Sequence, residues 1–116
     1  ELADALLDEL EDLDLGCVLA EPTSLLLGRA AARGWCTARE GYCDRRYRDD
    51  GSLLDRSEEG AVVADRTAVV AQAIELASAG RYESLCVHGD TPGALALARA
   101  VRDGLAANGI SLGSFT

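Results

Sequence analysis

The sequence predicts an α/β fold in which short parallel strands alternate with helices. Three apolar or partly apolar runs, at residues 17–20, 35–39 and 85–88, lie between stretches whose apolar residues have helical spacing. Helices long enough to cross from one strand to the next favour a parallel sheet covered by helices. This pattern leaves open whether the sheet closes into a barrel. In either architecture we expect the ligand site at the carboxyl ends of the strands.

Two helices and two strands are predicted in the first third of the chain. Residues 2–13 have leucines on one side and acids on the other, which predicts an amphipathic helix. The leucines expected to face the core are Leu2, Leu6, Leu10 and Leu13. A turn at residues 21–24 starts a second helix, which should stop at Gly34. A strand at residues 35–39 then leads into a long polar connection over residues 40–60.

Two further helices flank the third predicted strand. Asp65 is expected to cap a helix that ends at Gly80. Its buried stripe should consist of Val69, Val70, Ala73, Ile74 and Ala77. The last helix is expected to have Thr91 as its N-cap and Pro92 as its first residue, and to end at Asn108-Gly109. Its core face should consist of Ala94, Leu97, Ala98, Val101 and Leu105, and residues 110–116 should be extended.

Composition limits the classes of partner. A chain of 116 residues has room for one domain or part of one, and Glu1 is not an initiating methionine. We therefore expect a chain that was processed or cut from a longer one. The net charge of −9 disfavours nucleic acid as a partner. No apolar run approaches the roughly 18 residues that cross a bilayer, so we expect no membrane segment and a cytoplasmic location.

The four cysteines favour packing over chemistry. They show no Cys-x-x-Cys pair, and with a single histidine they make a poor zinc set. Cys17, Cys36 and Cys86 lie in or beside apolar runs, so we expect them to be reduced and packed as small hydrophobic residues. Cys43 lies in a polar loop among charged residues, but no general base adjoins it, so we expect no nucleophilic role.

The strand at residues 85–88 ends in His88-Gly89-Asp90, directly before a predicted helix. This position places His88 and Asp90 at a strand end, beside helix N–H groups that favour an anion. Two structural alternatives remain open. Asp90 could simply cap the helix, and His88 could be a hydrogen-bonded core histidine.

The polar connection after the second strand combines acids, cations and a phenol. Carboxylates there can act as a general base or hold a metal, and Arg45 or Arg56 can hold a ligand carboxylate through two parallel hydrogen bonds. Tyr47 can donate to a developing oxyanion. The alternative is a loop held together by its own Asp–Arg pairs. Because strand ends share one rim, we expect Glu21, Glu40 and its loop, and His88-Gly89-Asp90 to converge.

The same segments resemble a known family. The matching motifs are Glu40-x-Tyr42-x-Asp44-Arg45-x-Tyr47, Asp50-Gly51-x-Leu53, Arg56-Ser57, Gly60-Ala61-Val62 and Cys86-Val87-His88-Gly89-Asp90-Thr91-Pro92-Gly93-Ala94. Together, in this order, they resemble the carboxyl-terminal half of the LamB/YcsF family. The resemblance implies an irregular (β/α) barrel of the glycoside hydrolase/deacetylase type, of which residues 1–116 would form a single partial domain.

The resemblance also implies an activity. Family members work with the B and C subunits of one 5-oxoprolinase system to cleave 5-oxo-L-proline to L-glutamate with hydrolysis of ATP. Phosphorylation of the amide oxygen would turn it into a leaving group, and water would then attack. The expected catalytic residues are His88, Asp90, Asp44 and Glu40. The expected substrate-binding residues are Arg45, Tyr47, Arg56, Ser57 and Gly89, while a metal requirement stays open.

Several family segments do not occur in this sequence, including Asn-Cys-Asp-Leu-Gly-Glu and Lys-Pro-His-Gly-Ala-Leu-Tyr. We therefore expect the isolated chain to be inactive, and to pair with a complementary amino-terminal half or with itself. One alternative is a non-catalytic module that binds a ligand or docks to other subunits. Another is a metal-dependent deacetylase-like hydrolase, although one histidine cannot by itself supply a two-histidine site.

Overall fold

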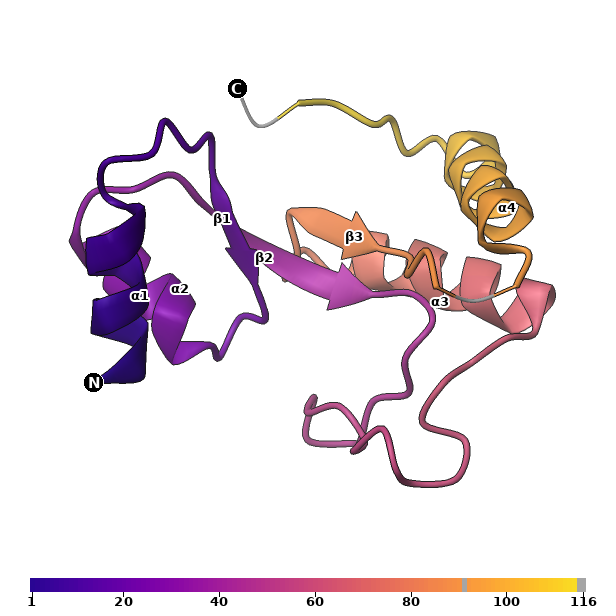
Figure 1. The fold of residues 1–116 in the computed structure, drawn as a ribbon. Helices are drawn as coiled ribbons and strands as arrows, with labels where there is room; N and C mark the ends of the chain where they lie inside the picture. The colour runs from indigo at the N-terminus through magenta and orange to yellow at the C-terminus, as the bar shows by residue number, and fades with distance from the viewer. Residues whose placement is uncertain (91, 115–116) are drawn as a thin grey trace.

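The computed structural model describes residues 1–90 and 92–114. In chain order its elements are α1 (Leu2–Leu10), β1 (Val18–Ala20), α2 (Leu25–Ala32), β2 (Thr37–Tyr42), α3 (Arg66–Ser78), β3 (Ser84–Cys86) and α4 (Ala94–Ala107) (Figure 1). The strands form one sheet in the order β1-β2-β3, and both neighbouring pairs are parallel. The predicted α/β fold with parallel β/α units is therefore confirmed.

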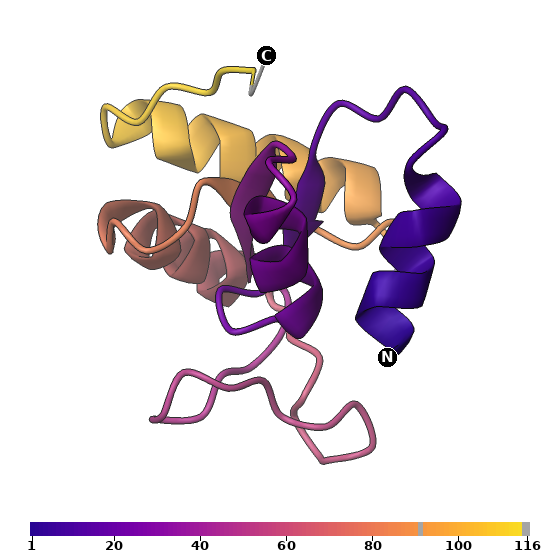
Figure 2. The same cartoon turned by 90° about the vertical axis from the view of Figure 1, so that its left-hand side faces the viewer.

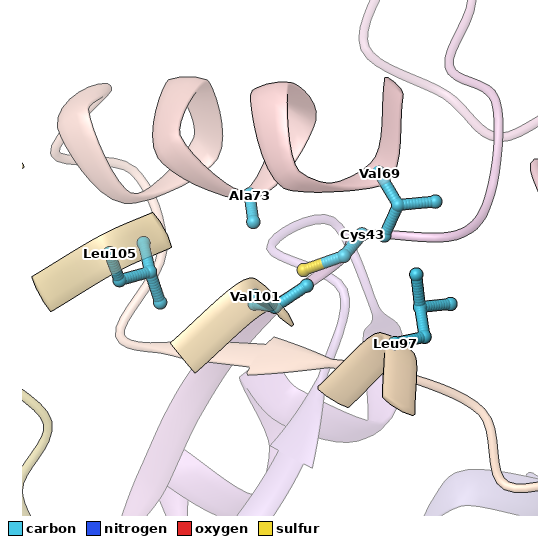
Figure 3. Packing of buried hydrophobic residues seen from close by; sticks show 6 residues of the cluster. All are labelled: Cys43, Val69, Ala73, Leu97, Val101 and Leu105. Atoms are coloured by element: carbon cyan, nitrogen blue, oxygen red, sulfur yellow. The ribbon is translucent and has the colours of Figure 1, made fainter. Parts of the chain in front are cut away.

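The helices pack in two groups. α3 and α4 lie side by side near β3, and α1 lies against α2 near β1 (Figures 1 and 2). The main hydrophobic core lies between α3, α4 and the end of β2. Its buried members are Cys43, Val69, Ala73, Leu97, Val101 and Leu105 (Figure 3). None of the helices described in residues 1–90 and 92–114 has the length and hydropathy needed to span a membrane.

The predicted core face of α1 is wrong. Leu2, Leu6 and Leu13 are 86%, 43% and 56% exposed, whereas Leu7 is fully buried. Ion pairs with α2 accompany this orientation. Arg33 binds Asp4 and Asp8, and Arg29 binds Glu1 and Asp4, so part of the acidic side of α1 faces its neighbour.

Two strands have different bounds from those predicted. β2 runs on to Tyr42, because Glu40 to Tyr42 pair with Ser84 to Cys86 in a regular register. Glu40 is therefore a strand residue and does not begin the loop. β3 stops at Cys86, since the next ladder donor, the His88 N–H, binds a side chain instead.

The helix ends largely follow the prediction. Asp65 caps α3 by accepting from the Ala68 N–H, and α3 ends just before Gly80, whose φ is +69°. α4 begins at Ala94 with Gly93 in a left-handed turn at its N-cap, so Pro92 precedes the helix and is not its first residue. Thr91, the predicted cap, lies outside the described residues, as do residues 115–116.

The buried stripes of α3 and α4 are mostly as predicted. Val69 and Ala73 are buried in α3, and Val70, Ile74 and Ala77 pack against them. Leu97, Val101 and Leu105 are buried in α4. Ala98 is the exception, because it lies exposed beside a surface hollow that Leu85 and Val87 also line.

The cysteine predictions need correction. Cys17 and Cys36 form a disulfide, since the pairing of Val18 with Thr37 brings the residues before them side by side, with Cα atoms 4.6 Å apart. Cys43 is not an exposed loop thiol. It is fully buried in the core, and burial raises the pKa of its thiol to about 12.

Candidate functional site

The site forms where β2 and β3 end. Side chains alternate along a strand, so Glu40 and Tyr42 lie on one face of β2, and Asp44 follows in the same series. Tyr42 pairs with Cys86 on β3, which puts Cys86, and His88 two residues later, on that same side. The register thus brings Asp44 and His88 together from positions 44 residues apart.

Two hydrogen bonds join Asp44 to His88. The Asp44 carboxylate accepts from the His88 backbone N–H and lies 2.8 Å from ring Nδ1, with one oxygen for each contact. The Asp44 side chain is 3% exposed and that of His88 is 26% exposed. Tyr42 stacks on the imidazole, with ring centroids 5.7 Å apart. A carboxylate at Nδ1 favours the tautomer with its proton on that nitrogen, which leaves Nε2 as the acceptor.

This geometry argues against the two structural alternatives for the His88-Gly89-Asp90 segment. Asp90 does not cap α4, because Gly93 occupies the N-cap position. His88 is hydrogen-bonded, yet its partly exposed ring lines a cavity and is not enclosed by the core.

The cavity beside the pair has a volume of about 180 Å³. Its lining residues are Asp44, Arg45, Arg56, Val62, His88, Asp90 and Pro92. Five predicted site residues therefore meet in one place, two cations and two carboxylates among them. This mixture of charges suits a small ligand that carries a carboxylate.

The connection after β2 folds over this cavity. Arg45 is 8% exposed, donates from Nη2 to the Leu54 carbonyl at 2.7 Å, and has a buried Nε without a hydrogen-bond partner. The Arg46 Nε donates to the Gly60 carbonyl at 3.0 Å. The loop is thus held together, as the alternative predicted, but these arginines use carbonyl oxygens and not aspartates.

Four predicted site residues do not line the cavity. Tyr47 lines a separate hollow beside Tyr82, and its hydroxyl accepts from the Tyr42 N–H at 2.8 Å. Ser57 donates to the Asp55 carboxylate within a local turn. The other two are Glu40, which lies farther back on β2, and Gly89, which is exposed.

Glu21 and Glu40 both lie near enough to act on Tyr42, but neither lines the cavity with His88 and Asp90, so the predicted convergence is only partial. Burial raises the pKa of Tyr42 to about 12 and is the largest cause of the shift. The neighbouring Glu40 carboxylate is the next largest cause, and the charge of Glu21 adds to it. Tyr42 therefore stays a neutral phenol at ordinary pH. It offers His88 an aromatic face without a competing charge.

Comparison with known proteins places this chain in a family. A model of the LamB/YcsF family matches residues 1–116. The chain belongs to the LamB/YcsF family. Its curated relatives include proteins named as the A subunit of 5-oxoprolinase. The one from Streptomyces avermitilis is 43% identical, over 84% of this chain and 44% of its own length. The one from Nocardia farcinica is 42% identical, over 99% of this chain and 51% of its own length.

A solved structure agrees with this assignment. The lactam utilization protein from Thermus thermophilus superposes with a TM-score of 0.83 at 25% identity, covering 95% of this chain and 49% of its own. This LamB/YcsF chain therefore has the fold of part of a TIM-like (β/α) barrel. It spans about half the length of the relatives it matches.

Sequence reasoning missed two residues of this LamB/YcsF site. Tyr42, the stacking partner of His88, belongs to a family motif but had no predicted role. Gln72, which contacts the backbone around Asp44, was not predicted at all. Its signal was a polar residue at helical spacing between buried Val69 and Leu76.

Metal ligands are not clustered in the part of this LamB/YcsF chain that the structure describes. No group of three or more His, Cys, Asp or Glu side chains in residues 1–90 and 92–114 is arranged to hold a metal ion.

Proposed function

We propose that this chain is part of an ATP-dependent 5-oxoprolinase, and that the Asp44–His88 pair carries out its proton transfer. The observation that carries the proposal is the hydrogen bond of 2.8 Å between His88 Nδ1 and Asp44 Oδ1. This pair lies beside a cavity whose lining includes two arginines. Relatives over 40% identical are named as the A subunit of 5-oxoprolinase, and the superposed structure is a lactam utilization protein. A lactam-opening reaction needs a base for water, which is the chemistry such a pair supplies.

In this proposal His88 is the general base. Its Nε2 takes a proton from the water that attacks the ring carbon, once the oxygen on that carbon has been phosphorylated by ATP. Asp44 keeps the ring oriented through the contact at Nδ1 and offsets the positive charge that the imidazole gains. As the C–N bond breaks, the proton that His88 took passes to the leaving nitrogen, and Asp90, on the same cavity wall, is placed to relay it. Hydrolysis of the remaining acyl phosphate by a second water then gives L-glutamate and phosphate.

Arg56 is proposed to bind the substrate carboxylate. It lines the cavity, and its exposed side chain forms no ion pair among the described residues. Arg45 is less available, because one of its terminal nitrogens already binds Leu54. We therefore assign Arg45 the role of fixing the loop, with its charge adding to the attraction of an anion.

The cavity lined by this chain alone has a volume of about 180 Å³, below the range of about 300–1,000 Å³ usual for sites of larger ligands. We therefore propose that most of the ATP molecule lies outside this cavity, in an assembly with the B and C subunits, with its terminal phosphate reaching the substrate. Because ATP is held inside cells, this proposal includes a cytoplasmic location.

The test is product formation by the assembled enzyme that contains this chain. We expect L-glutamate to form from 5-oxo-L-proline with ATP, and His88→Ala to abolish most of that activity. Asp90→Asn should also lower it, whereas Asp49→Asn, an exposed aspartate outside the cavity, should not. Full activity of both His88→Ala and Asp90→Asn would refute the assignment.

The same assembly tests the binding-only alternative. Calorimetry with 5-oxo-L-proline measures binding apart from turnover. If His88→Ala still binds the substrate but no longer forms glutamate, the residue acts in catalysis. If native and variant assemblies bind the substrate and neither forms glutamate, the chain is a binding module and the proposed function is wrong.

A further inference from the structure

We propose that Gln72 is a positioning residue, which fixes the backbone on both sides of Asp44 and so aims its carboxylate at His88. The proposal rests on the proposed function for its effect on catalysis, but its structural part stands on separate contacts. Gln72 belongs to α3, and its side-chain hydrogen bonds go to the backbone around Asp44 and not to the pair itself.

One amide nitrogen lies within hydrogen-bond distance of three carbonyl groups around Asp44, which share its two protons. The Gln72 Nε2 lies 2.7 Å from the Tyr42 carbonyl oxygen, 3.2 Å from that of Cys43 and 2.7 Å from that of Arg45. These carbonyls come from the two residues before Asp44 and the one after it. The contacts therefore hold the chain where it leaves β2 and turns over the cavity.

The strand pairing explains why the Cys43 carbonyl needs a donor. The Cys43 N–H donates to the Cys86 carbonyl at 2.9 Å, which is one step of the parallel ladder. The next step would place the His88 N–H on the Cys43 carbonyl. The Asp44 carboxylate takes that N–H instead, at 2.8 Å. Gln72 supplies a donor in its place, at 3.2 Å. The ladder therefore ends without leaving the Cys43 carbonyl oxygen unpaired.

The remaining backbone of Asp44 is also fixed. Its carbonyl oxygen accepts from the Val63 N–H at 2.8 Å, which ties it to the returning end of the loop. Gln72 is then the one side chain among the described residues that holds the backbone on both flanks of Asp44. We expect its removal to loosen the turn, while β2 and α3 keep their own hydrogen bonds.

Residue chemistry singles out glutamine at this position. Three carbonyl oxygens form a site for a neutral donor, and an amide NH₂ offers two protons. An ionised carboxylate has none and would face oxygen atoms, so Gln72→Glu should be tolerated only when the introduced carboxyl is protonated. Gln72→Met keeps the length of the side chain but removes both protons.

The experiment measures kcat and KM in the assembled enzyme together with the melting temperature. For Gln72→Met we expect kcat to fall by up to about 100-fold, since small displacements of a catalytic group cost that much. KM should stay within about twofold, because Gln72 does not line the cavity beside the pair. A kcat that stays within about twofold of the native value would overturn the proposal.

Gln72→Glu separates positioning from a general loss of folding. We expect its kcat, relative to the native enzyme, to recover as pH falls, because protonation restores one donor. The matched control is Ala71→Glu, which adds the same charge at an exposed neighbouring position on α3. If both variants have the same pH profile, the proposal is wrong.

A second readout does not depend on the reaction. The chain has one histidine, so its ring nitrogen signals report the Asp44–His88 pair directly. In the full chain, Gln72→Met should turn a single ring tautomer into a mixture, and Ala71→Glu should not. If Asp44→Asn leaves activity intact, the proposed function fails, and a retained single tautomer in Gln72→Met overturns the positioning role separately.

Discussion

Asp44 accepts hydrogen bonds from both the backbone and the ring of His88, with each carboxylate oxygen 2.8 Å from its donor. A single ring contact would leave the imidazole free to rotate about its own side-chain bonds. The second contact anchors the backbone beneath the ring, and stacking on Tyr42 fixes its plane. The pair is therefore held before any ligand binds, which is a property of efficient proton-transfer sites.

The first prediction concerns the proton on His88. Because Asp44 lies at Nδ1, the neutral His88 ring should carry its proton on Nδ1 and have no proton on Nε2. Long-range proton–nitrogen correlation spectra above about pH 8, where an ordinary histidine is neutral, measure this directly because the chain has one histidine. Asp44→Ala should remove the preference and Asp49→Ala should keep it. A ring protonated at Nε2 in the native chain would contradict the geometry.

The second prediction concerns substrate binding by Arg56. Loss of a charge-assisted hydrogen bond of about 1.5–3 kcal/mol should raise KM for 5-oxo-L-proline by about 10- to 100-fold in Arg56→Gln. The effect on kcat should be smaller, since the carboxylate is bound alike before and during reaction. Arg66→Gln, at the exposed start of α3, is the control. Equal KM values for both variants would exclude Arg56 from the binding site.

The third prediction concerns the Cys17–Cys36 disulfide. It closes a loop over a sequence separation of 19, which should stabilise the folded chain by roughly 3 kcal/mol. Urea unfolding followed by fluorescence of Trp35, the only tryptophan, measures the loss in a Cys17→Ser, Cys36→Ser double variant. With reductant present, as in a reducing compartment, the difference should largely vanish. Equal stability without reductant would show that the bond does not form.

The fourth prediction compares two helical glycines. A Cβ at Gly104 would lie 2.5 Å from the Val70 side chain, so α3 and α4 are in contact there without room for a methyl group. Gly104→Ala should lower the free energy of unfolding by about 1–3 kcal/mol. Gly28→Ala meets nothing within 4 Å and should raise it by about 0.5–1 kcal/mol. Thermal unfolding of both variants checks the sign, and a stabilising Gly104→Ala would refute the close packing.

The site could be predicted where local chemistry and topology were enough. Asp65 and Gly80 marked the ends of α3 because caps act locally. Asp44 and His88 met because the ends of parallel strands share one rim of a sheet. Neither inference needed the exact bounds of the strands, which were shifted in the prediction.

Other features depend on contacts that no local pattern encodes. Leu7, and not the leucine stripe beside it, is buried in α1, and the acids of α1 form ion pairs with Arg29 and Arg33 of α2. The disulfide follows from the register of β1 and β2, which periodicity leaves undetermined. The Tyr47 side chain lies outside the cavity, and its hydroxyl accepts a hydrogen bond from the Tyr42 N–H at the end of β2.

The most direct test of the account is Asp44→Asn in the assembled enzyme that contains this chain. The substitution keeps the size of the side chain but removes the charge that holds and balances the His88 ring. We predict that kcat for ATP-dependent glutamate formation falls at least about 100-fold, while Asp49→Asn stays near the native value. Native turnover in Asp44→Asn would contradict a catalytic role for the pair.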